Sequence, residues 1–140
     1  MKPLQKALIQ KIIDKFEGNV SFKNSKREYF FVNEQWLRLS NLKREEVIGK
    51  TDNEILSLDN AIRAEKTDMK AFEKQIPIEY TNSVILNGER IDFIAIKFVI
   101  NFGSGEHFFL CTIADFLYNK EKVLAFRKII DAFFERKGRR

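Results

Sequence analysis

The side chains best suited to chemistry in this sequence are few, and they do not form a catalytic pair. The 140 residues include one cysteine, Cys111, and one histidine, His107. Both fall in a segment that alternates like a strand, so their side chains share one face. Four strand residues span about 13 Å, which is too long for the hydrogen bond of a Cys–His nucleophile pair. We therefore expect Cys111 to be a buried small apolar residue and His107 to be exposed beside a Gly-rich turn.

The other polar motifs also have structural explanations. A single His and a single Cys exclude an intramolecular disulfide and two-His or multi-Cys metal sites. Glu34, Glu45 and Glu46 fall where short helices are predicted to begin, and the helix dipole stabilises carboxylates there. Gly103 and Gly105 separate two strands rather than a strand and a helix, so they do not form a phosphate-binding loop. The sequence therefore predicts no catalytic residues, no metal site and no enzyme activity.

Composition and charge describe a single soluble domain with a basic end. The chain is 44% hydrophobic and 32% charged, which is typical of a globular domain of this length. Its formal net charge is +5, and residues 118–140 carry all of that excess. Cations in the last turns of a solvated helix explain this distribution, and contact with an acidic partner or nucleic acid is the alternative.

Nothing in the sequence indicates a membrane protein. No apolar run is long enough to cross a bilayer. The first 16 residues are interrupted throughout by Lys, Gln and Asp, unlike a secretory signal. We therefore expect a cytoplasmic protein without a membrane partner.

Hydrophobic periodicity predicts a helix at each end of the chain and two groups of strands between them. The predicted helices cover 3–16, 59–74 and 119–136, with short helices from 34 to 56, and the predicted strands lie near 19–23, 29–33, 77–87, 90–101 and 106–117. Asn33 is expected to cap the first short helix, and Thr51 and Glu54 have capping-box spacing. An antiparallel sheet with helices grouped on one face fits this order. We divide the chain into an N-terminal amphipathic helix in 1–16, a central domain in 17–117 and a C-terminal basic helix in 118–140.

Four segments, in their order and spacing, resemble the PAS domain, a small sensor module of signalling proteins. They are YFFVNEQWLRLSNL, REEVIGKTDNEIL, IPIEYTNSVILNGERIDFIAIKF and FVINFGSGEHFFLCTIADF, and the resemblance spans residues 17–116. It implies an α+β fold with a five-stranded antiparallel sheet in the order 2-1-5-4-3. Short helices would cover one face, and helices would flank the domain at both ends.

The resemblance also bears on cofactors. Flavin-binding relatives that sense light carry a Cys in a helix, within a segment of the type N-C-R-F-L, whereas Cys111 lies in a predicted strand. Haem-binding relatives use a His on the long central helix, and residues 59–74 contain none. The cofactor is therefore left unknown, and haem and covalent flavin are disfavoured.

Fourteen phenylalanines indicate either a Phe-rich core or a cavity for a small apolar or aromatic ligand. On one assumed strand register, the candidate lining residues are Phe30, Val32, Trp36, Ile55, Phe72, Ile94, Ile96, Phe98, Leu110 and Thr112. A slip of one residue would move each strand's set to the opposite face of the sheet.

The two end helices carry apolar stripes with two possible uses. Val123, Phe126, Ile130 and Phe133 are spaced three, four and three apart, which is the seam of a coiled coil. Both helices can also fold back on the sheet. Because PAS domains use flanking helices to dimerise and relay signals, the resemblance favours a homodimer coupled to a fused or partner output domain. The candidate dimer and signalling residues are Ile9, Ile12, Phe16, Val123, Phe126, Ile130 and Phe133.

Three hypotheses for function follow. The leading one is a non-enzymatic sensory module that binds a small ligand or partner and relays its state through the C-terminal helix. The alternative is a small basic DNA- or RNA-binding regulator that uses the C-terminal helix. The third is a small-molecule enzyme on a similar sheet.

Overall fold

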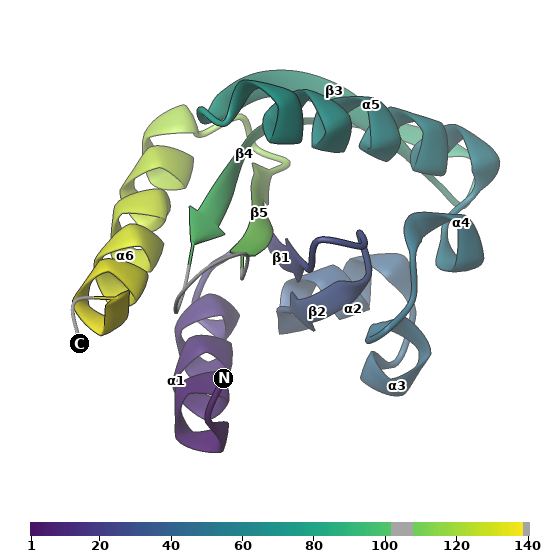
Figure 1. The fold of residues 1–140 in the computed structure, drawn as a ribbon. Coiled ribbons are helices and arrows are strands. Elements are labelled where there is room, and N and C mark those ends of the chain that lie inside the picture. Colours follow the sequence, from purple (N-terminus) through teal and green to yellow (C-terminus); the bar gives the residue numbers. More distant parts are fainter. Residues whose placement is uncertain (102–107, 139–140) are drawn as a thin grey trace.

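The computed structural model describes residues 1–101 and 108–138, with side chains up to residue 135. Six helices and five strands follow one another along this part of the chain (Figure 1). In order they are α1 (Pro3–Asp14), β1 (Asn19–Lys23), β2 (Tyr29–Val32), α2 (Glu34–Ser40), α3 (Arg44–Val47), α4 (Asp52–Ile55), α5 (Leu58–Lys74), β3 (Ile78–Leu86), β4 (Glu89–Asn101), β5 (Phe108–Asp115) and α6 (Lys120–Gly138). None of the described helices has the length and apolar content needed to cross a membrane.

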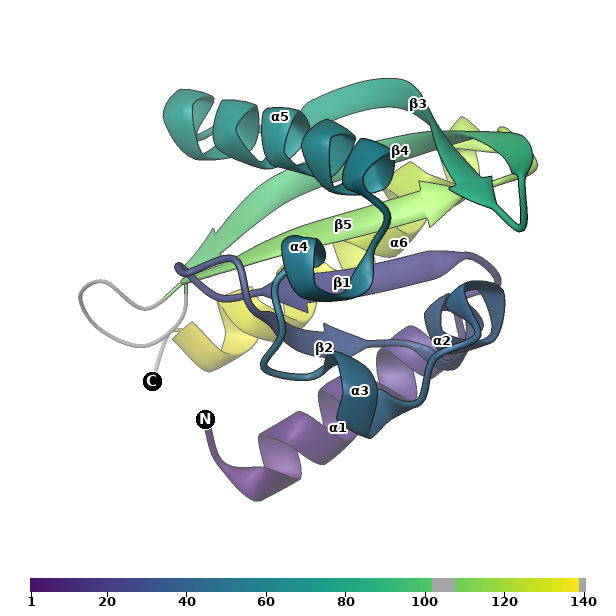
Figure 2. The ribbon, with the colours of Figure 1, turned by 90° about the vertical axis from the view of Figure 1, so that its right-hand side faces the viewer.

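The five strands form one antiparallel sheet in the order β2-β1-β5-β4-β3 (Figure 2). Hydrophobic periodicity predicted the strands, and the resemblance to the PAS domain implied this order; both are confirmed. The hairpin β1–β2 and the meander β3–β4–β5 are separated by four helices. They join where β1 pairs with β5, for example at Phe22 opposite Cys111.

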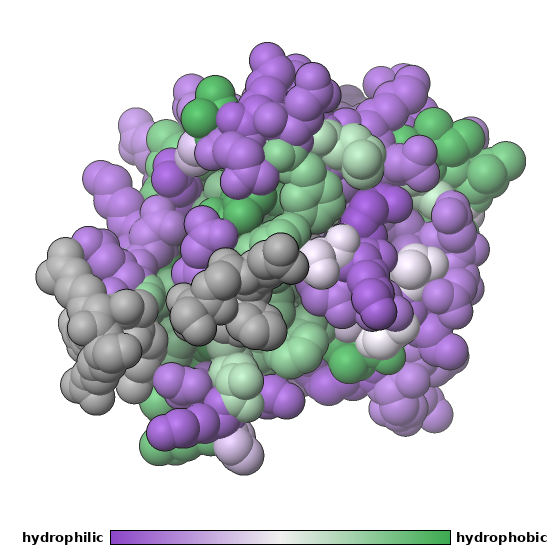
Figure 3. All heavy atoms as spheres, in the orientation of Figure 1, coloured by the Kyte–Doolittle hydropathy of each residue, from purple (hydrophilic) through white to green (hydrophobic). Residues whose placement is uncertain are grey.

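Helices cover both faces of the sheet. Figures 1 and 2 show α1 and α6 on one face and α2 to α5 on the other. The helices α1 and α6 were expected to flank the domain. They fold back onto the sheet instead and cover one of its faces. Hydrophilic residues cover most of the surface seen in Figure 3. Leu58 and Ile62, near the start of α5, are exposed hydrophobic residues.

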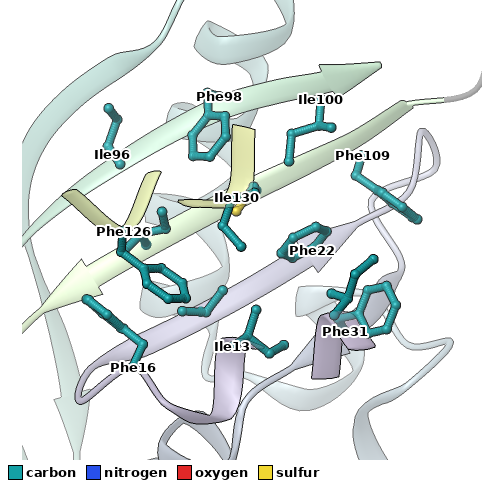
Figure 4. Close-up of a cluster of buried hydrophobic side chains, with 14 of the residues drawn as sticks. Ile13, Phe16, Phe22, Phe31, Ile96, Phe98, Ile100, Phe109, Phe126 and Ile130 are labelled. Carbon is teal, nitrogen blue, oxygen red and sulfur yellow. The ribbon is translucent and has the colours of Figure 1, made fainter. Parts of the chain in front are cut away.

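The main hydrophobic core lies between the sheet and the helices α1 and α6 (Figure 4). Phe22 at its centre is fully buried, and its ring lies 5.4 Å from that of Phe31 and 5.6 Å from that of Phe109. The buried members of this core are Ile9, Ile13, Phe16, Val20, Phe22, Phe31, Ile96, Phe98, Ile100, Phe109, Cys111, Ile113, Val123, Phe126, Ile130 and Phe134. Most of the strand phenylalanines therefore belong to a packed core.

Asn33 fastens three elements together at the end of β2. Its Oδ1 accepts hydrogen bonds from the backbone N–H groups of Val20 at 3.0 Å and Trp36 at 3.2 Å. Its Nδ2 donates to the carbonyl oxygens of Ile13 at 3.0 Å and Gly18 at 2.9 Å. The side chain thus caps α2 as the sequence predicted, and it also ties α2 to the end of α1 and the start of β1.

The outer side of β2 is paired with the turn after α3. The Tyr29 N–H donates to the Lys50 carbonyl at 2.9 Å, and the Gly49 N–H donates to the Tyr29 carbonyl at 2.8 Å. Gly49 has φ +86°, a conformation that strongly favours glycine. This segment leads into α4, whose predicted capping box between Thr51 and Glu54 is present.

Candidate functional site

A cavity of about 160 Å³ lies between the sheet and the helices on its second face. Its walls come from all five strands and from α2 and α5, with Leu56 and Phe116 added from the segments that flank them. The lining residues are the aromatic Tyr29, Trp36, Tyr80, Phe93 and Phe116, the aliphatic Leu39, Leu56, Ala64, Val84, Leu86 and Ala114, the neutral polar Asn19, Ser21, Ser40, Asn60, Thr67, Asn82, Ser83 and Thr112, and the cations Lys23, Arg63 and Lys97. The cavity is therefore amphipathic rather than lined by Phe alone.

Of the predicted lining residues, the structure places Trp36 and Thr112 at the cavity. It places Ile94, Ile96 and Phe98 on the opposite face, against the core under α1 and α6. The assumed register of β4 is therefore wrong by one residue, and Phe93 and Lys97 face the cavity instead.

The other predicted lining residues pack in neighbouring clusters outside the cavity. Phe30 packs against the main core. Val32 and Ile55 pack in a small cluster with Trp36. Leu110 and Phe72 pack in another, around Ala71 and Ile78. None of these five side chains lines the cavity.

An internal charge network holds α4 and α5 to the sheet beside the cavity. The Lys23 ammonium lies 2.5 Å from a carboxylate oxygen of Asp52 and 2.7 Å from one of Asp68. Lys97 donates to the other oxygen of Asp68. Arg27 reaches Asp52 at 3.2 Å and Asp68 at 2.9 Å. Burial alone would raise the pKa of Asp68, but the charges and hydrogen bonds of Lys97 and Lys23 lower it to about 2.

The network continues into the cavity wall through Tyr29. Its hydroxyl donates to Oδ1 of Asp52 at 2.6 Å, and its ring lies 5.2 Å from that of Trp36. Burial, together with the nearby Asp52 charge, raises the pKa of Tyr29 well above its usual value, so the phenol stays protonated. Tyr29 therefore contacts both Trp36 in the cavity wall and the buried carboxylate of Asp52.

The start of α5 is fastened to the outer side of β3 by two side chains. The Asn60 amide donates to the Ile85 carbonyl at 3.2 Å and accepts from the Ile85 N–H at 3.1 Å. The Arg63 guanidinium donates to the Ser83 carbonyl at 3.2 Å. Both residues also line the cavity, so this contact fixes its wall.

Sequence reasoning missed the cavity's charged residues. Lys97 interrupts an otherwise apolar strand, and a charged residue at such a position signals an internal partner. Lys23 gives a weaker signal, because it continues the polar positions of an alternating strand after Asn19 and Ser21. Both signals were readable in the sequence. The pairing itself could not be predicted from the sequence, because the partners Asp52 and Asp68 lie 29 and 45 residues beyond Lys23.

The candidate dimer residues are used within the protein. Ile9, Phe16, Val123, Phe126 and Ile130 are buried in the main core, and Ile12 and Phe133 pack partly buried against it. The rings of Phe16 and Phe126 lie 4.6 Å apart, which joins the two end helices.

The start of α6 is anchored to the end of β5. The carboxylate of Asp115 accepts a hydrogen bond from the Asn119 N–H at 2.7 Å. Lys122 lies 3.3 Å from the same carboxylate and donates to the Glu17 carbonyl at 2.6 Å. Through Lys122, the start of α6 thus contacts both Glu17 and Asp115, which lie at the two ends of the central domain.

The remaining candidate residues give no second site. Cys111 is buried as predicted, and burial raises the pKa of its thiol well above the usual value. His107, Gly103 and Gly105 lie outside the described residues. Within the described ranges, no group of three or more His, Cys, Asp and Glu side chains is placed to hold a metal ion.

Solved structures share this architecture at low sequence identity. No protein-family model matches the sequence, and no curated protein matches it. The PAS domain of BvgS from Bordetella pertussis is 16% identical over 91% of this chain and 96% of its own, with a TM-score of 0.69. The Rhodobacter sphaeroides LOV protein is 13% identical over 89% of this chain and 74% of its own, with a TM-score of 0.62. VqmA from Vibrio cholera, in a complex with a ligand and DNA, is 18% identical over 82% of this chain and 51% of its own, with a TM-score of 0.64. The chain therefore has the PAS fold.

Proposed function

We propose that this protein is a non-enzymatic sensory module that binds a small molecule in the cavity under α5. The observation that carries the proposal is the cavity itself, which has aromatic walls and convergent polar groups in a PAS fold. Asn19 adds to it, because its Oδ1 is buried, has no hydrogen-bond partner among the described residues and belongs to a cavity residue. A bound molecule or a water would donate the hydrogen bond that this acceptor lacks.

The signal would pass through the sheet to α6. Lys97 and Thr112 face the cavity, while their neighbours Phe98 and Ile113 pack in the core that includes α6. A shift of β4 or β5 on ligand binding therefore changes the surface on which α6 rests. One structure with this fold is described as the PAS domain of a two-component sensor histidine kinase, which is the kind of output that such a helix would serve.

We further propose a homodimer formed by the outward faces of the end helices. The previously expected seam is occupied within the protomer, so the available apolar side chains are Leu4 and Leu8 of α1 and Ile129 of α6. An output domain, fused or separate, would respond to the arrangement of the two copies.

A second candidate is a ligand-responsive nucleic-acid regulator. The net charge lies in residues 118–140, and VqmA shares the fold in a complex with ligand and DNA. Phosphate contacts weaken by about one log unit of affinity per log unit of salt for each contact, whereas an apolar helix contact is nearly indifferent. A steep salt dependence of duplex DNA binding would favour this candidate.

Native mass spectrometry of the purified full chain tests the main proposal. We expect a dimer of the 16.5 kDa chain that retains a small molecule, or takes one up from an extract of small metabolites. The Trp36→Phe variant should change retention, whereas Phe98→Leu, on the opposite face, should not. A monomer that retains nothing and takes up nothing contradicts the proposal.

A further inference from the structure

The charged groups at the cavity are all of one sign. Lys23, Arg63 and Lys97 line it, and no carboxylate of the described part of the chain does. Asp52 and Asp68 are fully buried in the network but are not cavity residues. An occupant therefore meets cations first.

The buried network does not cancel this positive charge. It combines the cations Lys23, Arg27 and Lys97 with the carboxylates Asp52 and Asp68, which leaves one cation in excess. Glu65 approaches Arg27 at 3.8 Å, but its side chain is 60% exposed, so water screens that charge. Excess charge beside a partly desolvated cavity favours an occupant of opposite sign.

Arg63 is the cavity cation with the most uncommitted donors, since Lys23 spends two of its three protons on Asp52 and Asp68. Lys97 already donates to Asp68, to the Thr67 hydroxyl at 2.7 Å and to the Ala64 carbonyl at 3.4 Å, which uses its three protons. Arg63 has five N–H donors and spends one on the Ser83 carbonyl. It forms no ion pair within the described residues, although its charge helps to lower the pKa of the exposed Asp92.

An aromatic surface lies next to Arg63. Ser83, which Arg63 contacts, adjoins Asn82, and Asn82 faces Phe93 across the β3–β4 pair. The Phe93 ring lies 6.1 Å from the Tyr80 ring and 5.5 Å from the Phe116 ring. The rings are inclined by 78° and 56°, so they form an angled aromatic wall in the cavity that Arg63 also lines. The edges and faces of such rings can hold an apolar body, and a guanidinium group binds a carboxylate in a bidentate manner.

We infer that the cavity takes an organic anion: a flat apolar body against Tyr80, Phe93 and Phe116, with its carboxylate on Arg63. This inference rests on the proposed function, since it names the chemistry of the molecule that the module senses. It differs from the expectation of a purely apolar or aromatic ligand by requiring a negative charge.

The test compares acids with neutral amides of nearly the same shape on the full chain. The probes are benzoate against benzamide, phenylacetate against phenylacetamide, and 2-naphthoate against 2-naphthamide. The single tryptophan, Trp36, lines the cavity, so its fluorescence reports occupancy. We expect at least one acid to bind about tenfold or more tighter than its amide, as for a charge-assisted hydrogen bond.

The Arg63→Gln variant locates the anion. Glutamine removes the charge, keeps a polar side chain and loses at most one part-buried hydrogen bond, to the Ser83 carbonyl, so we expect a folded protein in which the preference for the acid falls to about threefold or less. Arg38→Gln, on the exposed side of α2, is the matched control and should keep the full preference. Lys23 and Lys97 are unsuitable as variants because their loss would leave Asp68 underpaired.

Three outcomes decide the matter. An amide that binds as tightly as its acid overturns the inference and leaves the sensory proposal intact. A preference for acids that survives Arg63→Gln overturns the assignment of the carboxylate to Arg63. No saturable change with any of the six probes overturns the inference, and the native mass spectrum then decides the sensory proposal separately.

Discussion

Asp68 on α5 and Lys97 on β4 form an ion pair whose side chains are only 0% and 5% exposed. Lys23 shares the same carboxylate from β1, so one residue of α5 holds two non-adjacent strands. Taking such charges out of water costs free energy, which close partners return only in part. At this point α5 meets the sheet through buried ion pairs, whereas α6 on the other face meets it through apolar packing.

The Asp68→Asn substitution should strongly destabilise the protein. It removes the shared carboxylate, which leaves Lys23 with Asp52 alone and Lys97 buried without a carboxylate partner among the described residues. Breaking a buried pair in this way costs about 3–5 kcal/mol. Urea unfolding measures the loss, and Glu65→Gln, at a 60% exposed side chain, should cost less than about 1 kcal/mol. Equal losses in the two variants would show that the network contributes no more than a surface pair.

Acid should weaken the fold through the same residue. The pKa of Asp68 is lowered from 3.8 to about 2, so its contribution is complete above pH 4 and is lost as the pH falls toward 2. The shift corresponds to about 2 kcal/mol. Unfolding measured between pH 5 and pH 2 should show this loss in the unsubstituted chain. A pH profile of equal slope in Asp68→Asn would attribute the loss to other groups.

Asn33→Ala should be costly although it removes only a small side chain. The change leaves the N–H groups of Val20 and Trp36 and the carbonyls of Ile13 and Gly18 without their partner. Each buried unsatisfied group costs about 1–3 kcal/mol, so we expect a loss above about 3 kcal/mol. Asn33→Asp tests the assignment, because it retains the two accepted bonds and loses the donated ones, and it should fall between. Asn53→Ala, at an exposed position of α4, is the control.

Variants of the end helices should separate dimerisation from folding. Leu4 is 70% exposed, so Leu4→Glu should dissociate a dimer while changing the free energy of unfolding by less than about 0.5 kcal/mol. Phe126 is 7% exposed in the main core, so Phe126→Glu should cost about 3–5 kcal/mol whether or not a dimer exists. Sedimentation and thermal unfolding measure the two effects. A dimer that survives both Leu4→Glu and Leu8→Glu would place its interface elsewhere.

Alternation and turn residues were sufficient to predict the strands, and the resemblance to the PAS domain supplied their order. Neither gave the side of β4 that faces the cavity. In β4, Phe93 and Ala95 on one side and Ile94 and Ile96 on the other are all apolar, and helices cover both faces of the sheet. Polar residues occur on both sides as well, since Asp92 shares a side with Ile94 and Lys97 shares a side with Phe93. The pattern therefore does not fix the register, and the ambiguity is physical.

The end helices show a similar ambiguity. An apolar stripe such as Val123, Phe126 and Ile130 satisfies a coiled-coil seam and a sheet face equally well. Only the position of the sheet decides between them. In the structure these residues pack in the main core, against the sheet. The stripe therefore indicates that the residues are buried, but not which surface covers them.

Both edges of the sheet are already occupied, with a consequence for how copies of this chain can meet. Asn60 and Arg63 take up outward backbone groups of β3, and residues 49 and 50 take up those of Tyr29 on β2. An unprotected edge is a template on which a second chain adds a strand, the first step toward fibrils. At Ser83 and Ile85 on one edge and at Tyr29 on the other, that route to aggregation is blocked. Strand addition at this end of β3 would first require the start of α5 to move away, which links protection against aggregation to the contacts that hold that helix.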